Sequence, residues 1–119
     1  YLNRAEALVF LGKWESAITD INTIREKRIK NDYEITATNR EDALNKVWEE
    51  RRRELCFEKH RWFDLRRQGM PELRHIFTNG GSRKEYILPT GSKSYTLPIP
   101  KKIREQNKII VNIERPEQQ

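Results

Sequence analysis

Apolar residues recur at helical spacing near the start of the chain. In segment 2–11 they fall on two opposite sides of the expected helix, one ending in Val9 and the other in Leu11, which predicts packing on both sides. Gly12 then offers a left-handed helix cap, and a single apolar stripe follows it. Segment 1–29 should therefore form a helical hairpin. The stripe of its second helix consists of Trp14, Ala17, Ile18, Ile21 and Ile24.

A second helical pattern runs over residues 38–69, where large apolar side chains alternate with charges of both signs. Thr38 and Glu41 fit a capping box, in which each residue satisfies a free backbone N–H of the first turn. Gly69, with Pro71 two positions later, marks the end of the pattern. We therefore expect one long, highly charged helix region.

Two charged residues lie within the apolar stripe of this expected long helix. Arg51 and Glu58 share the stripe with Val47 and Leu55, so both charges should be at least partly buried. A buried charge without a partner is costly, which predicts an internal network of ion pairs. The expected members of this structural network are Arg51, Glu54, Glu58, Arg61 and Asp64.

The pattern changes character after Gly69. Turn-forming residues cluster at 79–82 and again at 89–92. Short β-prone runs at 86–88 and 95–97 flank the second cluster, which predicts a small hairpin around it.

The last part of the chain should be extended. Pro98 and Pro100 restrict the residues before them to extended geometry, and a short helix is expected after Pro100. Segment 70–119 is therefore expected to contain loops, a short β-hairpin and an extended C-terminal stretch, frayed over 115–119. The chain as a whole is predicted to be mainly α-helical.

The composition fits one modest core. The chain has 119 residues, of which 35% are hydrophobic and 35% charged, with a net charge of +6. Basic residues in the helical region are interleaved with Glu and Asp, which favours internal pairing over nucleic-acid binding. No apolar run approaches the roughly 18 residues that cross a bilayer. The first residues resemble the inside of a helix without a cap, so we expect a single C-terminal fragment of a larger domain.

Few residues offer catalytic or metal-binding chemistry. His60 and Asp64 stand one helical turn apart and His75 is the second of two histidines, but no HExxH or CxxC pattern completes a metal site. Cys56 also lies one turn from His60, without an orienting third group, and we expect a packed, inert thiol. The glycines do not form a phosphate-binding loop. We therefore expect no catalytic residues, no metal and no cofactor.

Four strings in a fixed order carry a resemblance to a known family. The segment Leu11–Ile18, which overlaps the first of them, resembles the turn of a tetratricopeptide repeat, with a glycine, an aromatic residue and an alanine at a close helix crossing. The strings are Arg4-Ala5-Glu6-Ala7 with Leu11-Gly12-Lys13-Trp14; Ile21-Asn22-Thr23-Ile24-Arg25; Glu50-Arg51-Arg52-Arg53-Glu54-Leu55-Cys56-Phe57-Glu58 with Arg61-Trp62-Phe63-Asp64-Leu65; and Tyr95-Thr96-Leu97-Pro98-Ile99-Pro100. Over residues 1–112 the chain thus resembles the C-terminal part of the SusD/RagB family.

The chain departs from the family pattern at two places. Family members usually have a glycine where Lys59 stands, and we expect the lysine to be tolerated on the surface of a helix. They also commonly end in an Asn-Pro-Gly-aromatic string, whereas this chain continues from Asn112 with Ile113-Glu114-Arg115-Pro116.

The resemblance implies a tetratricopeptide-like helical scaffold and recognition without chemistry. The family consists of surface-exposed outer-membrane lipoproteins of Bacteroidetes-type bacteria. Its members bind glycans or other nutrients and cap a TonB-dependent, SusC-like outer-membrane transporter. The resemblance thus implies nutrient delivery to such a transporter and a lipid anchor on an upstream cysteine. The alternative is a cytosolic helical-repeat adaptor that binds a protein or peptide partner.

Ligand contacts in this family vary and mostly lie in loops outside the helical scaffold. The candidate loops here are 30–37, which contains Tyr33, and 77–94, which contains Tyr86. These two tyrosines are the candidate ligand-binding residues. The three tryptophans lie on apolar stripes and are expected to be structural: Trp14, Trp48 and Trp62.

Overall fold

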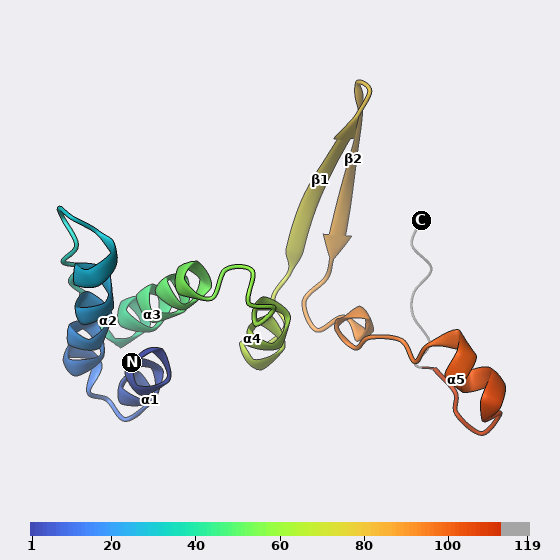
Figure 1. Cartoon of the computed structure of the whole chain (residues 1–119), viewed down its shortest axis with the longest axis horizontal. Helices are drawn as coiled ribbons and strands as arrows, with labels where there is room; N and C mark the ends of the chain where they lie inside the picture. Colours follow the sequence, from blue (N-terminus) through green and yellow to red (C-terminus); the bar gives the residue numbers. More distant parts are fainter. Residues whose placement is uncertain (113–119) are drawn as a thin grey trace. The chain divides into compact units, whose positions relative to one another are not determined.

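A computed structural model describes residues 1–112 of the chain (Figure 1). The chain forms two compact units, residues 1–61 and the residues from 62 onward. The first unit contains the helices α1 (Leu2–Phe10), α2 (Trp14–Arg28) and α3 (Arg40–Glu54). The second contains nearly all of α4 (Arg61–Arg67), the strands β1 (Leu73–Asn79) and β2 (Ser82–Leu88), the 3-10 helix η1 (Lys93–Tyr95) and the helix α5 (Lys101–Gln106).

The prediction of a mainly helical chain with one small hairpin is confirmed. Residues 1–112 form five α-helices and one sheet of two antiparallel strands. In this described part, no helix is long and apolar enough to cross a membrane.

The turn between α1 and α2 is built on Gly12. This glycine has a φ of +77°, a left-handed conformation that it adopts without a steric cost. Its N–H donates to the Val9 carbonyl at 3.1 Å, and the Lys13 N–H donates to the Leu8 carbonyl at 2.8 Å. These two hydrogen bonds form a Schellman motif, which satisfies the last carbonyls of α1 and turns the chain into α2.

Small and β-branched residues form the core of the first unit. Ala5, Ala17 and Ala43 come from three different helices and are each fully buried, which lets the helix backbones approach closely. On the second side of α1, Leu8 is partly buried against the core, whereas Ala7 and the capping residue Leu11 are exposed, so that side is only partly covered by the described residues. The buried cluster consists of Ala5, Val9, Ala17, Ile18, Ile21, Ala43 and Val47.

The cap of α3 lies one residue later than predicted. Asn39, rather than Thr38, is the N-cap, and its side-chain oxygen accepts the Asp42 N–H at 2.9 Å. The Asp42 carboxylate accepts the Thr38 N–H at 2.9 Å and the Lys46 ammonium at 2.7 Å. Asp42 therefore takes the place expected for Glu41, because its shorter side chain reaches back to the chain entering the helix.

The prediction of one continuous helix over 38–69 is wrong. α3 ends at Glu54 and α4 begins at Arg61, with tight turns between them. Phe57 and Lys59 have φ values of +66° and +63°, a left-handed conformation that an α-helix cannot contain. Residues 55–60 include no glycine or proline, so the residue types in this segment carry no signal for the break.

The break places Lys59 in a turn rather than on the surface of a helix, so that expectation is also wrong. A side chain with a Cβ pays about 1 kcal/mol to adopt a left-handed conformation. Glycine pays no such cost. The conformation of Lys59 thus explains why a glycine would suit this position.

The β-hairpin lies earlier in the chain than predicted. β1 and β2 pair antiparallel, with Asn79 opposite Ser82 at the end next to the turn. Gly80 and Gly81 form the two-residue turn with φ values of +54° and +85°, the left-handed pair that matches the twist of a hairpin. Tyr95, expected in the second strand, lies in η1 instead. The adjacent glycines make the tighter turn, and the segments that flank them therefore pair.

Tyr95 lies at the centre of the packing in the second unit. It is fully buried, and its ring stacks on Trp62 with 5.0 Å between ring centroids. Its hydroxyl donates a hydrogen bond to the Pro71 carbonyl. α5 begins directly after Pro100, as the proline predicts. The frayed end expected at 115–119 lies outside the described residues.

The left-handed turn leads to a stability prediction. Lys59→Gly should raise the free energy of unfolding by about 0.5 to 1 kcal/mol, because glycine removes the steric cost at this φ. Urea denaturation followed by circular dichroism measures the change. Glu58→Gly is the matched control: this exposed neighbour lacks a left-handed φ, and its replacement should lower stability. An equal loss of stability from both substitutions would contradict the left-handed conformation of Lys59.

The α3 cap leads to a prediction about acid stability. The hydrogen bond from Lys46, and then the one from the Thr38 N–H, hold the pKa of Asp42 below the ordinary value of an aspartate. The ionised carboxylate therefore stabilises the fold above that ordinary value, and the contribution is lost as the pH falls through the lowered pKa. Asp42→Asn should lower the melting temperature at neutral pH, and its difference from the wild type should shrink below about pH 4.

Thermal melts between neutral and acid pH test this prediction. Glu41→Gln removes the same charge from the first turn of α3 without touching the contacts of Asp42, and it serves as the control. A difference between wild type and Asp42→Asn that stays constant into acid would show that Asp42 does not titrate as expected.

Candidate functional site

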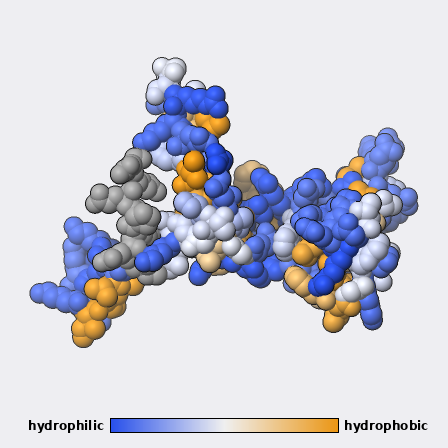
Figure 2. Space-filling model, turned by 180° about the vertical axis from the view of Figure 1, so that it is seen from behind, coloured by the Kyte–Doolittle hydropathy of each residue, from blue (hydrophilic) through white to orange (hydrophobic). Residues whose placement is uncertain are grey.

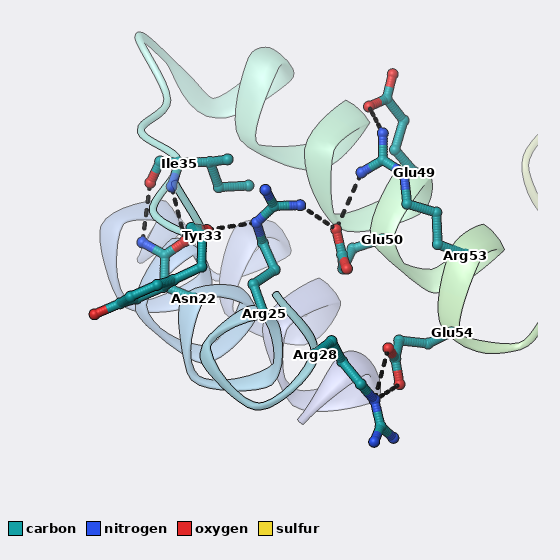
Figure 3. A network of polar contacts seen from close by, with 9 residues as sticks. All are labelled: Asn22, Arg25, Arg28, Tyr33, Ile35, Glu49, Glu50, Arg53 and Glu54. Carbon is teal, nitrogen blue, oxygen red and sulfur yellow. Dashed lines mark hydrogen bonds and ion pairs between the residues drawn. The ribbon is translucent and has the colours of Figure 1, made fainter. Parts of the chain in front are cut away.

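The loop between α2 and α3 is tied to α2 by polar side chains (Figure 3). The Asn22 amide donates to the Ile35 carbonyl at 3.0 Å and accepts the Ile35 N–H at 3.0 Å. Arg25 Nε donates to the Tyr33 carbonyl at 2.6 Å. Because these side chains satisfy loop backbone groups, the candidate loop 30–37 is anchored to the helical scaffold.

The same arginine joins the loop and α2 to α3. Arg25 Nη1 donates to Glu50 Oε2 at 3.0 Å, and only 12% of the Arg25 side chain and 4% of the Glu50 side chain are exposed. Arg53 Nη1 donates to the same Glu50 oxygen at 3.1 Å. A carboxylate held by two guanidinium groups away from water is a strong, directional contact.

Glu50 is the buried charge of α3 that the sequence pattern missed. It is 3% exposed, whereas Glu58, expected in the buried stripe, is exposed because it lies in the turn after α3. Arg51 is half-buried, as predicted, and its Nη1 donates to Asn3 Oδ1 at 2.7 Å. The helical spacing did not predict the burial of Glu50, because its partner, Arg25, lies on another helix.

Two other members of the expected network, Glu54 and Asp64, have partners outside that network. Glu54 accepts from Arg28 Nε at 3.2 Å, and Asp64, which is 6% exposed, accepts from Arg67 Nη2 at 3.0 Å. Arg61 is exposed and stands at the boundary between the two units. A single network that joins all five expected residues stays a prediction.

An open cleft of about 660 Å³ lies in the first unit, beside the start of α1 and the ends of α2 and α3. Leu2, Ile24 and Leu55 supply its apolar part, and most of its charged residues are basic. Its single carboxylate, Glu54, is held by Arg28. The lining offers surfaces for binding but no nucleophile with a base and an orienting group.

The three tryptophans contribute to packing. Trp14 packs against the buried cluster of the first unit, and Trp48 Nε1 donates to Glu6 Oε1 at 2.9 Å. Trp62 stacks on Tyr95, and its Nε1 has no hydrogen-bond partner among the described residues. Each indole is therefore at least partly withdrawn from solvent, which favours a structural role over contact with a ligand.

The two candidate tyrosines differ in their accessibility. Tyr33 is half-buried in the anchored loop between α2 and α3. Tyr86 is 43% exposed on β2, with the Lys84 ammonium 5.1 Å from the centroid of its ring. Tyr86 is therefore the more accessible of the two.

The residues considered for metal or thiol chemistry do not assemble. Within residues 1–112, no three His, Cys, Asp or Glu side chains are grouped to hold a metal ion. His60 is exposed on the turn before α4, and His75 is exposed on β1. Cys56 is exposed as well, so the expectation of a packed thiol is wrong. It is exposed because the turns that interrupt the helix carry it into solvent.

The chain was compared with known protein families, curated proteins and solved structures. The family model of the SusD family matches residues 1–115. No curated protein and no solved structure matches the chain.

The buried ion pair leads to a prediction about stability. Arg25→Ala should lower the free energy of unfolding by about 2 to 4 kcal/mol, because it leaves a buried carboxylate with one partner fewer and releases the Tyr33 carbonyl. Arg53→Ala, which removes the mostly exposed partner of the same carboxylate, should cost about 1 kcal/mol or less. Chemical denaturation of both variants measures the two values. Equal effects would contradict the central role of Arg25.

Proposed function

Because this chain belongs to the SusD family, we propose that it binds a nutrient at the bacterial cell surface and delivers it to a TonB-dependent transporter. Proteins of this family are non-catalytic binding proteins, so the chain is not an enzyme. The ligand class we propose is a glycan. The family match over residues 1–115 is the observation that carries the proposal.

The features of the described residues are compatible with binding. The first unit combines a small buried core with a loop anchored at both Asn22 and Arg25, so the loop is held against the helices. The surface drawn in Figure 2 is mostly hydrophilic, with hydrophobic side chains in separate small patches. Polar surfaces with a few exposed apolar groups suit sugars, which present both hydroxyls and apolar C–H faces.

We propose that the partner is a SusC-like transporter and that the protein is held at the outer membrane by a lipid on a cysteine upstream of this chain. Both parts of the proposal rest on what is typical of the SusD family. In this role the protein would hold the ligand over the transporter until it is taken up.

Titration calorimetry with defined oligosaccharides tests the binding step. The whole chain is titrated with neutral and acidic hexasaccharides, and saturable binding of at least one is expected. Saturable binding by the heat-denatured chain would show that the signal does not require the fold. Failure of every neutral and acidic oligosaccharide to bind would refute glycan binding.

The location is tested separately in the source bacterium. Protease added to intact cells should digest the full-length protein, and detergent extracts should contain it together with a TonB-dependent transporter. A cytosolic control protein must survive the same treatment. The alternative, a cytosolic helical-repeat adaptor, predicts that the protein is also protected, and that result would overturn the surface location.

A further inference from the structure

The register of the hairpin gathers two aromatic rings and two basic groups on one face. Directly opposed residues in an antiparallel pair point to the same side of the sheet. His75 is opposite Tyr86, and Phe77 is opposite Lys84. We call these four residues, two neighbouring pairs along the ribbon, the aromatic face.

The side chains of the aromatic face are accessible to a ligand. Phe77 is 51% exposed and Tyr86 is 43% exposed, and His75 and Lys84 are exposed as well. The Lys84 ammonium lies 5.1 Å from the centroid of the Tyr86 ring. This distance is within the range of a cation–π contact, so a positive charge stands next to an exposed aromatic ring.

The one acidic residue of the two strands, Glu85, lies on the face opposite the aromatic face. Glu85 is opposite Ile76, and both residues are one position along their strands from the aromatic face, so they lie on the other face of the hairpin. Arg74, also on that other face, donates to Glu72 at 2.7 Å and to Glu85 at 3.5 Å. The carboxylates of Glu72 and Glu85 are therefore both engaged by Arg74, and the four positions of the aromatic face include no acid.

We infer that the aromatic face binds an acidic oligosaccharide, a chain of pyranose rings that carry carboxylate or sulfate groups. This inference rests on the proposed function, because it names the class of glycan and the place where it binds. The C–H face of a pyranose packs against the electron-rich face of Phe77 or Tyr86. An anionic group on the same sugar reaches the Lys84 ammonium and forms a charge-assisted hydrogen bond.

The charge of the aromatic face also favours an acidic sugar over a second copy of the chain as the occupant. Two aromatic faces brought together would bury two Lys84 ammonium groups with no carboxylate from these positions to pair with them, and unpaired charge in an interface opposes association. An acidic sugar supplies the opposite charge and an apolar face in one ligand. It therefore fits both features of the aromatic face.

Four oligosaccharides of equal length separate the ligand chemistries. The whole chain is titrated with hexagalacturonate, its fully methyl-esterified form, a chondroitin sulfate hexasaccharide and neutral maltohexaose. We expect hexagalacturonate or the sulfated sugar to bind at least 10-fold more tightly than maltohexaose. The methyl ester should bind more weakly than hexagalacturonate by the same factor, because it keeps the pyranose rings and removes the charge.

Two matched pairs of variants locate the site. Lys84→Gln and Arg83→Gln each remove one positive charge from neighbouring positions on opposite faces of the hairpin. Tyr86→Ala and Ile87→Ala each remove a large exposed side chain, again from opposite faces. We expect Lys84→Gln and Tyr86→Ala to weaken binding of the acidic sugar about 10-fold or more. Arg83→Gln and Ile87→Ala should change it less than about 2-fold.

Nuclear magnetic resonance of the wild-type chain keeps the inference testable even where a variant disturbs the hairpin. Cross-strand contacts between Asn79 and Ser82 report whether the hairpin is formed. The ring protons of Phe77 and Tyr86 should shift on addition of the acidic sugar, and the methyl groups of Ile76 should not. Shifts confined to residues outside the hairpin would overturn the inference.

The outcomes distinguish this inference from the proposed function. If an oligosaccharide binds but both pairs of variants behave alike, or if the neutral sugar binds as tightly as the acidic one, the inference fails and glycan binding stands. If no oligosaccharide binds, both fail. If Tyr86→Ala instead dissociates a dimer seen by sedimentation, the aromatic face is a contact between copies and the inference is overturned.

Discussion

The arrangement of the first unit depends on the hydrogen bonds that the Arg25 guanidinium makes. The guanidinium reaches Glu50 on α3 and the Tyr33 carbonyl of the connecting loop, while Arg25 itself is part of α2. Taking both charges out of water is unfavourable unless their hydrogen bonds are made. Here Arg53 and the loop carbonyl help to make them. A sliding movement of α2 along α3 would therefore separate Arg25 from Glu50 and leave this buried carboxylate with one partner fewer.

The apolar core alone would specify this arrangement less firmly. Ala5, Ala17 and Ala43 bring the helices close together, but alanines offer little shape to distinguish one register from the next. Larger side chains such as Ile21 and Val47 fill the remaining space. The polar contacts then select one register, because misplacing them costs more than misplacing a methyl group. Packing brings the helices together, and the Arg25 network aligns them.

Several local features were predictable from the sequence, whereas features that depend on distant residues, or on residue types that carry no local signal, were not. The turn at Gly12 and the stripe of α2 follow from residue types within one or two helical turns. The burial of Glu50 depends on Arg25, and the break in the long helix depends on left-handed residues that are not glycine. For the candidate site, the exposure of Tyr86 agrees with its choice as a candidate, but its neighbours required the register of the hairpin.

The exposure of the hairpin also separates the residues that hold the scaffold together from the residues of the hairpin surface. The helices of the first unit contain buried or paired residues such as Ala5, Arg25 and Glu50, where substitution disturbs packing or removes a partner of a buried charge. On β1 and β2, by contrast, only the ends near Leu73 and Leu88 are partly covered. Exposed strand positions can change without a cost to the core. A protein of this kind can therefore keep its scaffold while the exposed side chains of its hairpin change.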